Sequence, residues 1–154
     1  MTAFLIGNFM LNGTVGVLLY LLITKKKKIF ADRYGMVVAM CGSGVLSLHL
    51  AMLTVFLIPD YFIIQVLFAL GIGAFIGKKF GSLMKYQSLL SGLFHGIIGG
   101  IMGMMLGIVI LNPSLCGLPS ASLNSLQDNM LIFTVFGTIL VIMTGSLLYY
   151  SLKV

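Results

Sequence analysis

Charged residues are scarce in this sequence. Only 8% of its 154 residues are charged and three are acidic, whereas 60% are hydrophobic. A soluble domain carries about 25% charged residues and about 45–50% apolar ones, so water could not solvate this surface. The composition therefore excludes an ordinary soluble domain. We expect residues 1–154 to form a single transmembrane domain, with the lipid bilayer as its solvent.

Cysteine and buried charge are also rare. Cys41 lies in an apolar segment and Cys116 in a polar loop, so no disulfide framework is expected. No Asp, Glu, Lys or Arg lies deep in an apolar segment, which argues against a proton-coupled antiporter built on a buried carboxylate. The serine–histidine neighbours in these segments have no acid to orient the imidazole. We therefore predict that the protein is not an enzyme.

Long apolar segments dominate what is present. Spanning a bilayer as a helix takes about 20 apolar residues, and five segments meet that length. They cover approximately residues 3–24, 34–58, 61–80, 88–111 and 129–152. The first segment is followed by lysines instead of being preceded by them, so we expect a retained helix and not a signal peptide. The predicted fold is all-α, with five transmembrane helices.

The basic residues predict the topology. All nine lie in short gaps between the segments or near the chain end: Lys25, Lys26, Lys27, Lys28, Arg33, Lys78, Lys79, Lys85 and Lys153. With the N-terminus outside and the C-terminus in the cytoplasm, every one falls on the cytoplasmic side, as the positive-inside rule requires. The same distribution argues against nucleic-acid binding. We expect a multi-pass protein of the cell membrane whose successive helices are antiparallel neighbours.

Glycine is concentrated in the third and fourth segments. Two series recur every three or four residues and place small residues on one side of each helix: Gly73, Gly77 and Gly81, then Gly92, Gly96, Gly100, Gly103 and Gly107. Small residues allow helix backbones to approach closely in lipid, where no hydrophobic force drives association. The pattern predicts glycine-zipper packing of these two helices, within one chain or across a homo-oligomer interface.

Soft metal donors occupy the second and fourth segments. They are Cys41, His49, Met52, His95, Met102 and Met105. At about 1.5 Å per residue, Cys41 and His95 lie about 10–12 Å from the inner helix ends, and His49 and Met102 about 22 Å. Two facing helices would offer two donor layers suited to Cu(I) or a similar ion. The leading functional hypothesis is a small transport protein or channel for a soft metal cation such as copper.

Several alternatives stay open from the sequence. Methionine and cysteine also serve as adaptable packing residues, and each histidine could bond a serine or a carbonyl of a neighbouring helix. The chain could be an accessory or assembly subunit of a larger membrane complex, or a haem-b protein ligated by His49 and His95.

Four polar residues complete the sequence pattern. Asn8 and Asn12 lie one turn apart in the first segment, and Thr134 and Thr138 lie at a comparable depth in the fifth. Buried amides need partners, so we expect these two helices to pack through hydrogen bonds. The alternative is that the four side chains line a polar vestibule on the outer side.

Overall fold

The protein is a bundle of long helices. The structure, a computed structural model, describes residues 2–26, 32–59, 61–83, 86–117 and 123–151. Its elements are α1 (Thr2–Lys26), α2 (Asp32–Leu57), α3 (Phe62–Gly81), α4 (Tyr86–Leu111), the 3-10 helix η2 (Pro113–Cys116) and α5 (Leu123–Ser151). All five α-helices are long and apolar enough to cross a membrane. The predicted all-helical fold with five spans is therefore confirmed.

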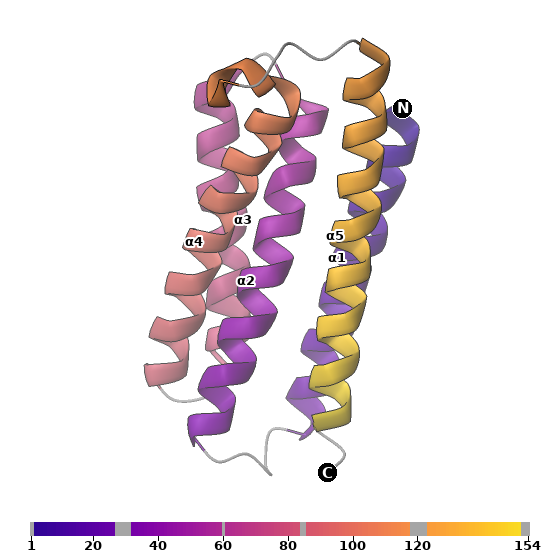
Figure 1. The fold of residues 1–154 in the computed structure, drawn as a ribbon. Helices are drawn as coiled ribbons and strands as arrows, with labels where there is room; N and C mark the ends of the chain where they lie inside the picture. Colours follow the sequence, from indigo (N-terminus) through magenta and orange to yellow (C-terminus); the bar gives the residue numbers. More distant parts are fainter. Residues whose placement is uncertain (1, 27–31, 60, 84–85, 118–122, 152–154) are drawn as a thin grey trace.

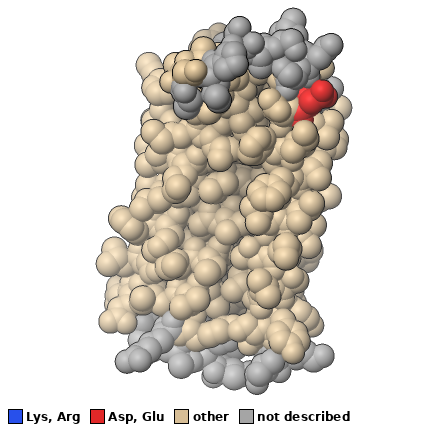
Figure 2. All heavy atoms as spheres, viewed as in Figure 1, with Lys and Arg blue, Asp and Glu red and all other residues tan. Residues whose placement is uncertain are grey.

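Successive helices run antiparallel, as Figure 1 shows. An odd number of spans places the N-terminal end of α1 and the C-terminal end of α5 at opposite ends of the bundle (Figure 1). The last turn of α3, with Lys78 and Lys79, lies at the same end as the last turn of α1. On the face drawn in Figure 2, no charged side chain interrupts the surface between the two ends. Which end faces the cytoplasm stays a prediction.

The fifth helix is longer than the sequence predicts. It begins at Leu123, although the apolar segment was placed from residue 129, and η2 occupies part of the expected loop. Hydropathy marks only the part of a helix that lies in lipid, whereas the hydrogen-bonded helix extends through polar residues beyond it. The loop between α4 and α5 is correspondingly shorter than predicted.

The five helices form two groups. α2, α3 and α4 pack on one another, while α1 and α5 lie side by side against α2 (Figure 1). α2 is the central helix. In its most apolar stretch 61% of the residues are buried, whereas only 11% are buried in the corresponding stretch of α1. Because α2 contacts all four other helices, its side chains can reach a site at any of those four contacts.

Glycines allow α3 and α4 to approach at the backbone. A Cβ placed on Gly77 would lie 2.5 Å from the carbonyl oxygen of Gly92 and 2.8 Å from Cα of Leu93. A Cβ on Gly96 would lie 2.9 Å from Cα of Gly77. No side chain larger than hydrogen fits at these positions without moving one helix, so this surface is backbone against backbone.

The glycines of α4 serve two neighbours. Gly92, Gly96 and Gly100 face α3, whereas a Cβ on Gly103 would meet the backbone of Leu48 and one on Gly107 the side chain of Val55, both in α2. An α-helix turns by about 100° per residue, so the five glycines span about 80° of the surface of α4. A stripe of that width can contact both α2 and α3 where those two helices meet. The stripe was predicted to contact the third helix along its whole length, but Gly103 and Gly107 contact α2 instead.

Candidate functional site

A polar cluster lies between α1, α2 and α5 inside this apolar bundle. It consists of Asn8, Asn12, His49, Thr134 and Thr138, which we call the polar cluster. Asn12 and Thr134 have no exposed surface and His49 is 1% exposed. Two asparagines one turn apart on α1 face two threonines one turn apart on α5, and α2 supplies the imidazole. The cluster contains no charged residue.

Thr138 links the members of the cluster. Its hydroxyl is 2.8 Å from Oδ1 of Asn8 and 2.9 Å from the carbonyl oxygen of Thr134, and it donates its single proton to one of them. It also accepts from Nδ2 of Asn12 at 3.2 Å. The predicted hydrogen-bonded packing of the first and fifth helices is therefore confirmed.

His49 joins the cluster through its Nε2 atom, which lies 3.4 Å from the Thr138 hydroxyl oxygen. Room for the ring comes from Gly137, because a Cβ at that position would overlap the imidazole. With its proton on Nε2, His49 donates to Thr138 and presents a lone pair at Nδ1. The ring is thus held between α2 and the backbone of α5.

Three atoms of the cluster are buried without a partner. Among the described residues, the buried side-chain nitrogen and oxygen atoms that lack a hydrogen bond are Oδ1 of Asn12, Nδ1 of His49 and Oγ1 of Thr134. Each such atom costs about 1–3 kcal/mol, because it loses its interaction with water and gains nothing in return. All three can accept a hydrogen bond or coordinate a cation. The cluster is therefore rich in neutral acceptors.

Thr134 differs in its hydrogen bonding from the other threonines inside the helices, Thr2 at the start of α1 being left aside. Thr14, Thr24, Thr54 and Thr144 donate to a carbonyl three or four residues earlier in their own helix, and the Thr138 hydroxyl lies 2.9 Å from such a carbonyl. That bond is the usual way for a threonine hydroxyl to be satisfied in an apolar helix. Thr134 makes no such bond, and its buried hydroxyl has no hydrogen-bond partner among the described residues.

The metal donors predicted from the sequence lie in several environments. Met52 is 2% exposed and packs in an apolar cluster of the core, whereas Met102 and Met105 are 56% and 59% exposed on the outside of α4. His49 faces α5 and Met102 faces outward, so the structure does not bring them together as a donor layer.

Cys41 lies on α2, and His95 of α4 lies at the contact between these two helices. Cys41 is a half-buried free thiol, and Nδ1 of His95 lies 2.9 Å from the carbonyl oxygen of Ser91 in its own helix. The Cβ of His95 would lie 4.0 Å from a Cβ placed on Gly44 of α2. In the described part of the chain, no group of three His, Cys, Asp or Glu side chains could hold a metal ion. The six-residue metal path stays a prediction.

Four members of the polar cluster were predicted together from the sequence, whereas the fifth, His49, was predicted among the metal donors. The available signal was depth measured from the other helix end. At about 1.5 Å per residue, His49 lies about 12 Å from Leu57, and Asn12 about 15 Å from Thr2, at the same end of the bundle. The glycine at position 137, one residue before Thr138, was the second signal, because it leaves space for a ring.

Comparison with known proteins finds no matching family model, no similar curated protein and no similar solved structure.

Proposed function

We propose that the protein is a small multi-pass membrane transport protein or channel, in which the polar cluster binds a small cation. The observation that carries this proposal is the group of three buried, unpartnered acceptors on Asn12, His49 and Thr134. Each of these atoms can coordinate a cation, and we propose that the bound ion takes its ligands from among them. Because the cluster is neutral, binding would be weak enough for release, which conduction requires.

The donor set defines the class of cation. It combines one imidazole nitrogen with amide and hydroxyl oxygens. Imidazole suits Zn, Cu, Fe and Ni, whereas neutral oxygens suit harder ions. The soft cation predicted from the sequence, copper, would share His49 with this site but would lack thiol or thioether ligands in it. We therefore propose a small monovalent or borderline cation, with Cu(I) as one member of the class.

Cation flux into vesicles tests this function. The purified protein is reconstituted into liposomes that contain fluorescent indicators for Na⁺, K⁺ or Cu(I), and uptake is compared with that of empty vesicles. Thr134→Val removes one acceptor while preserving shape. We expect flux of the transported ion to fall at least about tenfold, since a hydrogen bond or contact to a charged group contributes about 1.5 kcal/mol or more.

Thr144→Val is the matched control. It lies on the same helix, and its hydroxyl bonds only the carbonyl of Leu140 on the exposed side. We expect its flux to equal that of the wild type. The proposal is wrong if the wild type moves no tested cation above the level of empty vesicles, or if the two valine variants lose flux equally.

A second candidate role is that of an accessory or assembly subunit of a larger membrane complex. The observation that favours it is the exposure of α1, because only 11% of the residues in its most apolar stretch are buried against the rest of the chain. A partner helix would fit such a surface, and so would a second copy in a homo-oligomer. Purification from native membranes in mild detergent tests this: one stoichiometric partner supports it, and isolation of the chain alone contradicts it.

We also propose that the close contact of α3 and α4 acts as a glycine zipper in the bilayer, as the sequence predicts. The glycines that face α3 are used within one chain, so a homo-oligomer would need another surface. The haem-b alternative finds less support, because His49 faces α5 while His95 bonds its own helix. An optical spectrum without a Soret band would exclude it.

A further inference from the structure

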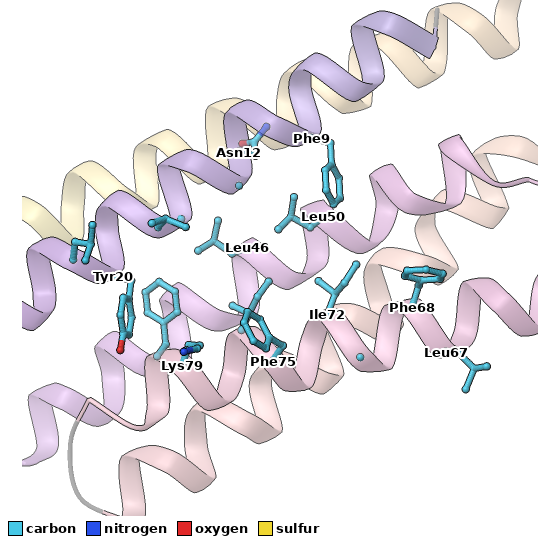
Figure 3. Close-up of a pocket in the computed structure, with 17 residues that line it drawn as sticks. Phe9, Asn12, Tyr20, Leu46, Leu50, Leu67, Phe68, Ile72, Phe75 and Lys79 are labelled. Atoms are coloured by element: carbon cyan, nitrogen blue, oxygen red, sulfur yellow. The ribbon is translucent and has the colours of Figure 1, made fainter.

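A groove opens sideways between α1 and α3, with α2 as its floor. It has a volume of about 890 Å³ and takes its walls from all three helices. Figure 3 shows Phe9 and Phe68 toward one end, and Tyr20 with Lys79 at the other. Glycines widen it: a Cβ on Gly71, which lines the groove, would meet nothing within 4 Å. The groove is therefore open space bounded by aromatic and aliphatic side chains.

One end of the groove carries an uncompensated positive charge. The Nζ atom of Lys79 lies 5.6 Å from the centre of the Phe75 ring, and no carboxylate pairs with it among the residues that the structure describes. A cation over an aromatic face at this distance is weakly held. Lys78 and Lys25 are exposed at the same end of the bundle. A groove that is apolar along its length and cationic at its end complements an amphipathic anion.

The length of the groove matches one leaflet. From Leu67 to Lys79 it follows α3 for twelve residues, about 18 Å at 1.5 Å per residue. The hydrocarbon core is about 30 Å thick, so one leaflet contributes about 15 Å. A transmembrane helix would need the full thickness and a width of about 10–12 Å. The groove is too short for a second helix and long enough for an acyl chain.

We propose that this groove binds one acyl chain of an anionic lipid from the leaflet on the lysine side, with the headgroup at Lys79. The chain packs on Phe75 and Phe68 and reaches toward Phe9. The phosphate lies at the level of Lys79, where the Tyr20 hydroxyl can also donate to it. Basic pockets between transmembrane helices bind phosphorylated lipid headgroups for the same electrostatic reason.

Charge, and not the acyl chain, determines which lipid is selected. A tail that leaves bulk lipid for the groove gains no hydrophobic free energy, because both surroundings are hydrocarbon. The difference between an anionic and a zwitterionic lipid is therefore due to the lysines. Each lysine near the surface contributes about fivefold to the binding of an anionic lipid. Removing Lys79 should reduce the preference for anionic lipid by about that factor.

Fluorescence quenching by brominated lipids tests the proposal, since the chain contains no tryptophan. Phe75→Trp places a single fluorophore in the groove, and Phe94→Trp places one on the outside of α4. The two positions are similarly exposed, at 63% and 59%. In vesicles of phosphatidylglycerol and phosphatidylcholine, bromine is carried by one lipid or the other. We expect Phe75→Trp to be quenched more by brominated phosphatidylglycerol, and Phe94→Trp to show no preference.

Two pairs of variants in the Phe75→Trp background identify the groups that bind. Lys79→Gln should lower the preference about fivefold, whereas Lys78→Gln removes a neighbouring charge that does not line the groove and should lower the preference less. Gly71→Leu fills the groove and should abolish the preference. Gly7→Leu, also in open space but away from the groove, should not.

Three outcomes would overturn the proposal. Equal quenching of Phe75→Trp by the two brominated lipids would show that the groove does not select an anionic headgroup. Equal effects of the two lysine variants would show that general surface charge is responsible. The absence of quenching by either lipid would show that protein, such as a second copy of the chain, covers the groove.

Discussion

Gly77→Ala is the substitution whose effect on stability the structure specifies most directly. The added Cβ would lie 2.5 Å from the carbonyl oxygen of Gly92, about 0.9 Å inside the distance of 3.4 Å at which ordinary contact begins. The obstacle is backbone, which cannot rotate away as a side chain can. α3 and α4 must therefore separate along their contact.

The magnitude follows from that separation. A gap of about 0.5–1 Å removes about a quarter to a half of the dispersion energy of each atom pair across the contact. Overpacking of this kind costs about 1–3 kcal/mol. We therefore expect Gly77→Ala to lower the free energy of unfolding by about 1–3 kcal/mol. Gly71→Ala, on the same helix but in open space, should raise it by up to about 1 kcal/mol through helix propensity.

Titration with sodium dodecyl sulfate in mixed micelles, followed by circular dichroism, measures both free energies. The two variants have identical composition and differ only in where the methyl group lies. A difference below about 0.5 kcal/mol, the scatter expected of surface substitutions, would refute the conclusion that α3 and α4 meet at Gly77.

Two further predictions concern the cluster and the topology. Gly137→Ala should displace the His49 ring, lowering the free energy of unfolding by about 1–3 kcal/mol and reducing cation flux, whereas Gly7→Ala, in open space, should do neither. Equal effects of the two alanine variants in the same titration would contradict this. Single cysteines at Lys25 and Lys78, in a background without native cysteines, should react with a membrane-impermeant thiol reagent from the same side of intact vesicles. Labelling from opposite sides would contradict the five-span arrangement.

The fold was predictable because lipid imposes simple rules on sequence. A spanning helix must satisfy its own backbone hydrogen bonds, so each apolar segment of about 20 residues becomes one helix. The ends were less predictable. α5 begins at Leu123, among polar residues that hydropathy does not mark as part of a span. Its backbone hydrogen bonds continue beyond the apolar segment. The contact of Gly103 with α2 instead of α3 could not be predicted from helical periodicity either. Periodicity shows which residues share one face of a helix, but it does not show which helix that face contacts.

The candidate site was only partly predictable. The pairing of Asn12 with Thr138 follows from depth and from the need of a buried amide for partners. The location of His49 does not follow, because α2 contacts four helices and a side chain on it could face any of them. Donor chemistry suggested Met102 as its neighbour, but Met102 points outward. Ligand type alone does not identify the neighbour of a side chain, because packing decides which helix it faces.

The buried hydroxyl of Thr134 adds no hydrogen bond to the packing of the helices. The packing of α1 on α5 needs the bonds made by Asn8, Asn12 and Thr138, and Thr134 contributes only its backbone carbonyl to them. Valine has the same shape, so it would fill the position without the cost of about 1–3 kcal/mol for an unsatisfied hydroxyl. Proteins leave buried polar groups without hydrogen-bond partners mainly at functional sites. Thr134→Val should therefore raise the free energy of unfolding in the absence of cation while it lowers flux, and a variant that lost stability would show that the hydroxyl is bound by the protein itself.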